Sequence, residues 1–315
     1  MKNIAVFGSG GFIGKNTVNY LKRFDNNNVF AISHQDVDLL CANDVEYFIR
    51  QNKIDVIIHC ANTGGTRKNI VNNQVVENNL RMFFNLEHCL QQDMLMISFG
   101  SGAQYNKSRN LIKVDEKTIQ FSVPADSYGY SKYIISRYIQ ARSQQCGNGK
   151  CINPVIFGMF GIGEDYEYRF ISNAIIKNIL KMPIVINQDV VFDYLYIKDY
   201  FKVLDKILDN TIDMTEFNLT PTESISLTNI AKLINEVGSY KSDIIVRNSG
   251  LNYQYTGSNQ LLMSQIGYDF KFTPYIDAIE QMYHYYAKHI GEMDLSAVIE
   301  DRYVNRCQVK NTVNI

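Results

Sequence analysis

The feature that most constrains the fold is a glycine-rich turn close to the start of the chain. Residues 2–7 (KNIAVF) form a short apolar run with β-branched residues, which is typical of a strand buried in a parallel sheet. The run leads directly into GSGGFIG, which contains Gly8, Gly11 and Gly14. Apolar residues then recur at helical spacing over residues 13–24. The sequence therefore predicts a strand, a tight turn and a helix.

A turn of this kind suits a dinucleotide. Glycines let the chain leave the strand sharply, let the backbone approach a pyrophosphate and let the helix pack on the sheet, while the first helical amides face the anion. A glycine triplet alone also occurs in purely structural turns, so its place between the first strand and a helix carries the prediction. We expect the turn to bind the cofactor through Gly8, Gly11, Phe12, Ile13 and Gly14.

Strands and helices continue to alternate up to about residue 160. Strands are expected at 29–33, 56–60 and 94–99, and helices at 44–51 and 78–90. This alternation predicts an α/β fold with a Rossmann-type doubly wound parallel sheet. Beyond residue 160 the pattern weakens, with helices expected at 169–180, 199–208 and 227–237 and short strands at 184–186 and 194–197.

We therefore expect a Rossmann domain at 1–165, to which the chain returns around 190–225, and a smaller C-terminal substrate lobe at 166–290. Helix 227–237 has Ser226 as its expected N-cap and Gly238 as its expected C-cap. Residues 291–315 have weak periodicity. They form either an extension or an arm on a neighbouring subunit, and the sequence leaves their role open.

Composition excludes several classes of protein. With 31 Lys plus Arg against 32 Asp plus Glu, the net charge is −1, which argues against a nucleic-acid binder. No apolar run approaches the roughly 18 residues of a membrane span, and no signal peptide fits before the first strand. The cysteines form no CxxC pair, so we expect free thiols in a reducing cytoplasm. They are Cys41, Cys60, Cys89, Cys146, Cys151 and Cys307.

The end of the second strand distinguishes the two nicotinamide cofactors. NAD sites usually place a carboxylate there for the ribose 2′-hydroxyl, whereas a 2′-phosphate needs neutral or basic neighbours. Ser33 and His34 stand in this place, so NADP(H) is favoured. If Asp36 folds back to the ribose, NAD(H) is the alternative, with Asp38 and Leu39 beside the adenine. No second His or Cys stands at ligand spacing from His34, so no metal site is predicted.

Tyr128 and Lys132 form a YxxxK motif. On a helix the two side chains lie one turn apart on one face, where the ammonium can lower the pKa of the phenol and hold the nicotinamide ribose. The motif alone is weak in a chain with 21 tyrosines, and Tyr194 and Lys198 repeat it. The second copy lies in an alternating apolar run, where tyrosines are expected to pack. We therefore assign the catalytic role to the first copy.

Ser101 stands upstream of Tyr128 at the end of a predicted strand. Its hydroxyl can hydrogen-bond the oxygen that receives a proton from Tyr128 while hydride arrives at the carbon. As a residue of FGSGA it also suits a structural turn, but the presence of Tyr128 and Lys132 favours catalysis. Asn79 either buttresses Lys132 through water or caps a helix, and both alternatives stay open.

These motifs together resemble the extended short-chain dehydrogenase/reductase family, in particular its nucleotide-sugar reductases and epimerases. The resemblance covers about residues 1–290, and the most similar members are the GDP-L-fucose synthases, 4-keto sugar epimerases and reductases that use NADPH. It implies cofactor contacts by Cys60, Ala61, Thr63 and Pro154, and substrate contacts by Gly102, Ala103 and Val155. Its carriers are GSGGFIG (8–14), QDVDLL (35–40), IDVIIHCANTGG (54–65), Asn79 with Asn85-Leu86, SGAQY (101–105), PADSYGYSK (124–132) and DYLYIKD (193–199).

Two departures from the family pattern concern proton transfer at the sugar. Fucose synthases carry a Cys two residues after the catalytic Ser and a later His, the acid/base pair for C3 and C5 epimerisation. Here Ala103 and, through EYRFIS, Arg169 take these places. Family dehydratases use an Asp-Glu pair where Gly102 and Ala103 stand. The resemblance therefore implies keto-reduction, or its reverse, without C3/C5 epimerisation or dehydration.

A third departure concerns the substrate diphosphate. The family usually has an Arg directly before the aspartate of the DYLYIKD run, where Phe192 stands here. The basic residues often found in a later loop are replaced by residues 252–255 (NYQY). Arg169, Lys177 and Arg247 are the candidates to neutralise a diphosphate, and tyrosines are candidates to stack on a base.

The resulting prediction is an NADP(H)-preferring reductase of a 4-keto-6-deoxy nucleotide sugar, with hydride delivered to C4 and Tyr128 as proton donor. Alternatives are an NAD-retaining nucleotide-sugar 4-epimerase, a reductase of small non-sugar ketones, and a non-catalytic dinucleotide sensor or scaffold. The presence of Tyr128 and Lys132 argues against the last.

The resemblance also implies a cytoplasmic homodimer formed through helices 78–90 and 128–140. Six apolar residues of these helices fit either that contact or packing on the sheet. They are Phe83, Phe84, Ile134, Ile135, Tyr138 and Ile139.

Overall fold

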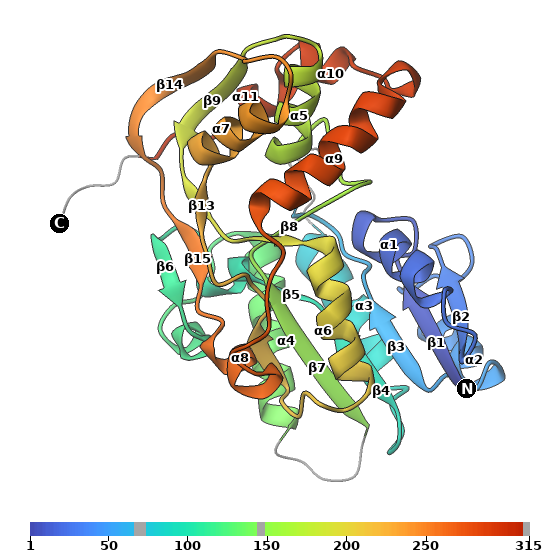
Figure 1. The fold of residues 1–315 in the computed structure, drawn as a ribbon. Coiled ribbons are helices and arrows are strands. Elements are labelled where there is room, and N and C mark those ends of the chain that lie inside the picture. Colours follow the sequence, from blue (N-terminus) through green and yellow to red (C-terminus); the bar gives the residue numbers. More distant parts are fainter. Residues whose placement is uncertain (66–73, 144–148, 311–315) are drawn as a thin grey trace.

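The computed structural model describes residues 1–65, 74–143 and 149–310. Its centre is a parallel sheet of seven strands in the order β12-β7-β4-β3-β1-β2, with β5 beside β7 (Figure 1). This confirms the predicted Rossmann-type doubly wound sheet. The strands are β1 Lys2–Phe7, β2 Asn27–Ile32, β3 Val56–His59, β4 Leu95–Ser98, β5 Gly100–Ser101, β7 Lys150–Ile156 and β12 Glu216–Asn218.

Helices cover both faces of this sheet. In β1, Ile4 and Val6 join the apolar core under α1 and α6, whereas Ala5 and Phe7 join the core under the other helices. Because both faces are buried, the strand is a continuous apolar run in the sequence rather than an alternating one. The helices on one face are α1 Phe12–Leu21 and α6 Ile197–Leu208, and those on the other are α2 Ala42–Gln51, α3 Val75–Glu87 and α4 Ser127–Arg142.

A smaller lobe lies above the carboxyl ends of the sheet strands in Figure 1. Three helices pack together there through buried apolar residues, beside a parallel pair of strands. In α7 the Oγ of Ser226 accepts a hydrogen bond from the amide of Asn229 (3.1 Å), and Gly238 is the C-cap, as predicted. The lobe contains α5 Phe170–Ile179, β9 Ile184–Asp189, α7 Leu227–Val237, β14 Ile244–Leu251 and α9 Tyr275–His289.

Short strands connect the two parts. A four-stranded sheet has the order β13-β10-β15-β6, and β8 pairs with β11 in parallel. The remaining elements lead into and out of these strands. They are η1 Gly102–Tyr105, β6 Leu111–Val114, η2 Glu116–Gln120, β8 Gly158–Phe160, β10 Val191–Phe192, β11 Tyr194–Tyr196, β13 Ile225–Ser226, β15 Tyr255–Gly257 and α8 Gln260–Ile266.

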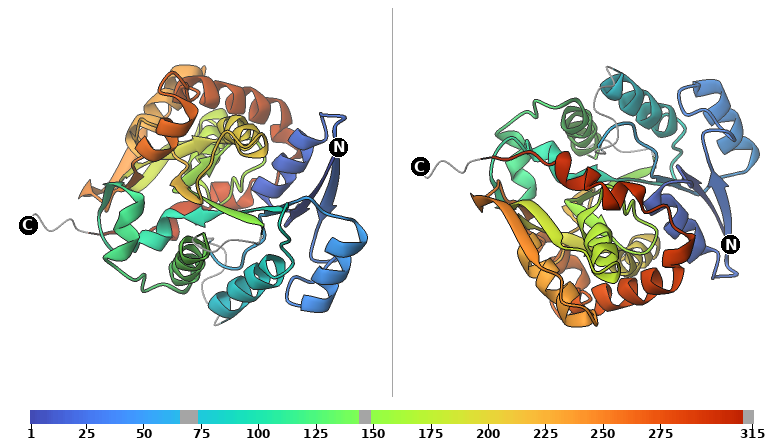
Figure 2. Two further views of the ribbon diagram at one scale, coloured as in Figure 1. Left: turned by 90° about the horizontal axis from the view of Figure 1, so that it is seen from below. Right: turned by 90° about the horizontal axis from the view of Figure 1, so that it is seen from above.

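The segment that follows α9 folds back onto the smaller lobe of its own chain, as the view from above in Figure 2 shows. It contains η3 Ile290–Glu292, α10 Ser296–Ile299 and α11 Arg302–Asn305. Val298, Tyr303 and Val304 are buried in the core of the lobe. Up to Lys310, therefore, this part of the chain packs as an extension on its own lobe.

The apolar residues on the two helices expected to form the dimer contact differ in how deeply they are buried. Phe83, Ile135 and Ile139 are buried in the core of their own chain, so they serve sheet packing. Phe84 and Tyr138 are half-buried, and their rings meet edge to face with centroids 4.9 Å apart. Three of the six residues expected at the dimer contact are therefore buried within their own chain.

The structure also bears on thiols and membranes. Five cysteines are free thiols, and Cys146 lies outside the described residues. The five are Cys41, Cys60, Cys89, Cys151 and Cys307. Over the described ranges, no helix combines the length and the apolar character needed to cross a membrane.

Candidate functional site

The glycine turn has the shape that a pyrophosphate requires. Gly8 adopts a φ of +81°, and a Cβ there would lie 2.6 Å from the amide nitrogen of Ala61. A Cβ at Gly10 would meet nothing within 4 Å, so this side of the turn is open. The N-terminus of α1 has no side-chain cap and no acid in its first turn, which leaves its amides available to an anion. The turn therefore fits a dinucleotide.

The residues after β2 place a carboxylate beside the turn. The Oδ2 atom of Asp36 accepts hydrogen bonds from the amide (2.8 Å) and the hydroxyl (2.6 Å) of Ser33. These bonds hold the pKa of Asp36 below its usual value. His34 is exposed, and Asp38 accepts a hydrogen bond from the amide of Leu40 (2.9 Å). Asp36 thus folds back to Ser33 at the strand end, whereas the NAD(H) alternative requires this carboxylate to meet the cofactor ribose.

A cavity of about 570 Å³ opens where the sheet strands end, beneath the smaller lobe. Its floor comes from residues that follow β1, β3, β4 and β7, the edge at which parallel α/β sheets bind ligands. The structure brings together many of the predicted residues there. Those that line the cavity are Phe12, Ile13, Cys60, Ala61, Ser101, Ala103, Tyr128, Lys132, Arg169 and Phe192.

Other predicted residues lie behind or beside the cavity wall. Leu39 is buried in the core under α2. Pro154 and Val155 are interior residues of β7, paired with β12. At Gly102 a Cβ would collide with the ring of Phe157, which itself lines the cavity. Pro154 and Val155 support the wall from within the sheet, and Leu39 is not among the described residues that line the cavity.

Tyr128, Lys132 and Ser101 meet at one end of the cavity. The Nζ of Lys132 donates a hydrogen bond to the carbonyl oxygen of Phe99 (2.7 Å) and lies 5.8 Å from the centroid of the Tyr128 ring. The Oγ of Ser101 accepts a hydrogen bond from the amide of Ala103 (3.3 Å), so Ser101 caps the turn as its structural alternative expected. The same hydroxyl faces the cavity.

The electrostatics of this end differ from the expectation for Tyr128. Burial raises the pKa of Tyr128, while the hydrogen bond with Ser101 and the charge of Arg169 lower it. The sequence predicted Lys132 for this lowering, but its ammonium is directed at the Phe99 carbonyl instead. Burial lowers the pKa of Lys132 to about 8.

Two further titratable groups sit at the end of β3. His59 is buried, and its Nδ1 has no hydrogen-bond partner among the described residues. Burial, together with the charge of Lys132, lowers the pKa of His59 to about 3. Burial raises the pKa of Cys60 to about 12. At neutral pH both groups are therefore uncharged, and Lys132 is the only one of the three that carries charge.

Asn79 positions the loop after β3. Its Oδ1 accepts a hydrogen bond from the amide of Thr63 (2.7 Å), and its Nδ2 donates to the carbonyl of Thr63 and the hydroxyl of Ser131, each at 3.0 Å. The helix-cap alternative is wrong, because α3 begins at Val75 and Asn79 lies inside it. Asn79 ties the loop to α4 one residue before Lys132.

The second YxxxK motif serves packing. The ring of Tyr194 is half-buried and packs against the rings of Phe192 (5.1 Å) and Phe160 (6.3 Å), centroid to centroid. The Nζ of Lys198 donates a hydrogen bond to Gln281 (2.5 Å). Its tyrosine and lysine therefore lie in different elements, β11 and α6, as the alternating apolar run indicated.

Tyr255 is a site residue that the sequence marked only as part of a departure from the family. Its hydroxyl lies 3.5 Å from the Oγ of Ser101, and burial raises its pKa. Its ring packs edge to face on Phe157 (5.1 Å) and on Phe192 (5.8 Å). Phe192 thus forms part of an aromatic wall where the family has an arginine. The spacing of residues in the sequence gave no signal for Tyr255, because this tyrosine reaches the site from β15, far along the chain from Ser101 and Tyr128.

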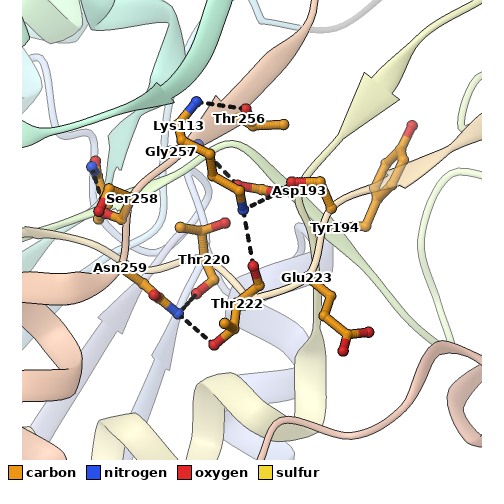
Figure 3. A network of polar contacts seen from close by, with 12 residues as sticks. Lys113, Asp193, Tyr194, Thr220, Thr222, Glu223, Thr256, Gly257, Ser258 and Asn259 are labelled. Carbon is orange, nitrogen blue, oxygen red and sulfur yellow. Dashed lines mark hydrogen bonds and ion pairs between the residues drawn. The ribbon is translucent and has the colours of Figure 1, made fainter. Parts of the chain in front are cut away.

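A buried carboxylate holds β15 in place (Figure 3). Asp193 accepts hydrogen bonds from the amide of Gly257 (2.8 Å) and the hydroxyl of Ser224 (2.5 Å), and forms an ion pair with Lys113 (3.2 Å). Lys113 also donates to the carbonyl of Thr222 (3.0 Å). Because Gly257 lies two residues after Tyr255, this network fixes the tyrosine against Ser101.

The predicted basic residues lie elsewhere than expected. Lys177 is buried and forms an ion pair with Asp301, and Arg247 pairs with the same carboxylate at 3.6 Å. Neither is among the described residues that line the cavity. Arg169 does line it, at the end near Tyr128. The prediction that Lys177 contacts substrate is therefore wrong, because its ammonium is committed within the lobe.

Three basic residues that the sequence did not single out line the cavity instead: Lys107, Arg306 and Lys310. Two of them belong to the C-terminal segment, whose weak periodicity gave no sign of a site. The one available signal is the spacing of Arg302, Arg306 and Lys310, four residues apart.

Comparisons with known proteins agree with this architecture. The profile of the NAD dependent epimerase/dehydratase family matches residues 4–219. A GDP-6-deoxy-D-talose 4-dehydrogenase from Aggregatibacter actinomycetemcomitans is 23% identical over 296 residues, covering 89% of this chain and 96% of that protein. A GDP-L-fucose synthase from Dictyostelium discoideum is 26% identical over 305 residues, covering 89% and 93%.

A solved structure shares the fold. It is the GDP-mannoheptose C4 reductase from Campylobacter jejuni with NADP bound, with a TM-score of 0.75 and 18% identity. The match covers 90% of this chain and 98% of the reductase chain.

Proposed function

The chain belongs to the NAD dependent epimerase/dehydratase family, as an NAD(P)-dependent enzyme of the extended short-chain dehydrogenase/reductase type, and from this premise we propose its reaction. The protein is an NADP(H)-preferring reductase of a 4-keto-6-deoxy nucleotide sugar. By their names, the two relatives act on GDP-linked sugars, and the solved reductase is named for reduction at C4.

The convergence of Tyr128, Lys132 and Ser101 at one end of a single cavity carries this proposal. The bound nicotinamide supplies hydride to C4 of the sugar. Tyr128 donates its phenolic proton to O4, and the hydroxyl of Ser101 holds that oxygen in place. Lys132 holds the nicotinamide ribose. The phenolate that remains on Tyr128 is stabilised by the charge of Arg169 and the hydrogen bond with Ser101.

At the two positions where fucose synthases carry the Cys and His of C3 and C5 epimerisation, this chain has Ala103 and Arg169, and both line the described part of the cavity. Ala103 is 2% exposed and has no proton to exchange. The guanidinium of Arg169 offers hydrogen-bond donors and no acceptor, so it cannot take a proton from the sugar. Keto-reduction without epimerisation is therefore the reaction that these side chains support.

The preference for NADP(H) is part of the proposal. Ser33 and His34 at the end of β2 are compatible with a 2′-phosphate, and the solved C4 reductase holds NADP. Against it stands the carboxylate of Asp36, which is held at Ser33. The proposal also includes a cytoplasmic homodimer formed through α3 and α4, on which Phe84, Ile134 and Tyr138 are half-buried.

Replacement of the proton donor tests the reaction. In Tyr128→Phe we expect kcat to fall about 10²- to 10⁴-fold, the usual contribution of a general acid, with unchanged binding of NADPH by fluorescence titration. Tyr130→Phe is the matched control, since Tyr130 is on the same helix and is exposed. A residual rate within about tenfold of the wild type would contradict the assignment of Tyr128.

The substrate class is tested with 4-keto-6-deoxy sugars linked to GDP, CDP, dTDP and UDP. We expect one of them to oxidise NADPH with a stoichiometry of about one per sugar reduced. Interconversion of the corresponding 4-hydroxy nucleotide sugars without net consumption of NADPH would instead identify a 4-epimerase. Failure of the protein to bind any of the four nucleoside diphosphates would overturn the nucleotide-sugar assignment.

A further inference from the structure

The charges that line the cavity are all positive. Among the described residues of its wall there are five lysine or arginine side chains and neither an aspartate nor a glutamate. The chain as a whole has a net charge of −1, so this distribution is local to the site. A cleft lined by one sign of charge concentrates ligands of the opposite sign. The cavity is therefore built for an anion.

Two of these charges are held close to each other. The Nζ of Lys310 donates a hydrogen bond to the carbonyl oxygen of Lys107 (3.1 Å) and lies 5.1 Å from the centroid of the Tyr253 ring. Burial and the charge of Lys107 lower the pKa of Lys310. Lys107 itself pairs with Asp126 at 3.1 Å. The charge of Asp126 acts in the opposite direction and raises the pKa of Lys310, but burial and Lys107 outweigh it. A bound anion would add to the effect of Asp126 and further stabilise the two ammonium groups.

The segment that carries Lys310 is anchored along the cavity wall. The amide of Lys310 donates to Gln188 (3.0 Å), and Nδ2 of Asn252 donates to the carbonyl of Gln308 (2.9 Å). Nδ2 of Asn187 donates to the carbonyl of Cys307 (2.8 Å). All six of these residues line the cavity. The backbone here is fixed independently of the lysine ammonium, so the ammonium can serve a ligand.

A second anchor lies further back along the chain. Asp301 accepts ion pairs from Lys177 of α5 and Arg247 of β14. Lys177 is 2% exposed, so its charge is satisfied only while α11 is docked on the lobe. Lys177 and Arg247 therefore help to position the segment that carries Lys310.

We propose that Lys310, together with Lys107, binds the diphosphate of the nucleotide-sugar substrate and replaces the arginine whose place Phe192 takes. This inference rests on the proposed function. It makes the C-terminal segment a part of the substrate site, and it assigns the positive charge near the diphosphate to a residue more than 100 positions after Phe192.

Calorimetric titration of the full chain tests the inference. The wild type is titrated with GDP, UDP, dTDP and CDP, and then with the nucleoside of whichever diphosphate binds most tightly. In Lys310→Met we expect that diphosphate to bind about 10- to 100-fold more weakly, because this is the usual free-energy contribution of a hydrogen bond to a charged group. The affinity for the nucleoside is expected to stay within about twofold of wild type. Lys310→Arg keeps the charge and is expected to retain most of the affinity.

Two controls accompany the titration. Lys288→Met removes an exposed lysine of α9 and is expected to bind like the wild type. Circular dichroism of each variant shows whether the fold is intact, and NADPH titration then shows whether the substitution affects the dinucleotide site.

Each outcome has a separate meaning. If the wild type binds a diphosphate and Lys310→Met binds it equally well, the inference is wrong and the proposed function stands. Equal losses of affinity for the diphosphate and for the nucleoside would also overturn the inference, because Lys310 would then not act on the phosphates in particular. A parallel loss of NADPH affinity would assign the contact to the cofactor's phosphates and overturn it as well. If the wild type binds none of the four diphosphates, the proposed function itself fails.

Discussion

His59 allows the strongest quantitative prediction about pH. It ends β3 and is 4% exposed, and its pKa is about 3 in the folded chain against an ordinary value of 6.5. Between these two values the unfolded chain binds a proton that the folded chain does not bind. Stability therefore falls as the pH falls through 6.5, and this loss ends only below about pH 3.

The size of the effect follows from the shift. Each pH unit within this window costs up to about 1.4 kcal/mol, so His59 alone removes up to about 2.7 kcal/mol of unfolding free energy between pH 6.5 and 4.5. This is a large share of the roughly 5–15 kcal/mol that stabilises a typical domain. In His59→Leu no proton can bind at this position, so that part of the acid sensitivity is expected to disappear.

Urea denaturation at pH 6.5 and at pH 4.5, without added cofactor, provides the measurement. The wild type is expected to lose up to about 2.7 kcal/mol more than His59→Leu between the two values. His284→Leu removes an exposed histidine of α9 and is the control, which should follow the wild type. If His59→Leu and the wild type lose the same free energy, His59 is not held neutral by burial and the reasoning is refuted.

The remaining predictions concern the cofactor and the assembly. Asp36→Asn removes the exposed carboxylate held at Ser33, so the ratio of kcat/KM for NADPH to kcat/KM for NADH should rise severalfold. An unchanged ratio would show that Asp36 does not face the 2′ position of the adenosine ribose. Light scattering should give twice the 36.2 kDa mass of one chain, and Phe84→Asp should shift the mass to that of a monomer; a monomeric wild type would remove the dimer from the proposal.

The parts of the fold that follow local rules could be predicted closely. Helix α7 begins at Leu227 and ends at Val237, as expected, because a capping serine and a glycine mark its two ends. Helix α3 was expected at 78–90 and lies at Val75–Glu87, because its N-cap, Gln74, makes no side-chain capping bond that would mark the start. Boundaries were therefore accurate where a cap residue stands in the sequence.

The catalytic end of the site was also accessible from the sequence, but its electrostatics were not. The glycine turn and the YxxxK motif depend on spacings of a few residues, and the structure brings Tyr128, Lys132 and Ser101 to one cavity. The pKa values of these groups depend on burial and on distant residues. The ammonium of Lys132 is directed at the carbonyl of Phe99, and Arg169 faces Tyr128 from the smaller lobe.

The sequence by itself determined the doubly wound sheet, the glycine turn and the YxxxK pair of Tyr128 and Lys132, because each is encoded by residues that are neighbours along the chain. Only the tertiary structure decided which charges line the cavity. The sequence suggested Arg169, Lys177 and Arg247 for this role, and of these only Arg169 lines the cavity. Lys177 and Arg247 pair with Asp301, whereas Lys310 reaches the carbonyl of Lys107. Such contacts join residues far apart in the chain, and which of them form depends on how the C-terminal segment packs on the lobe.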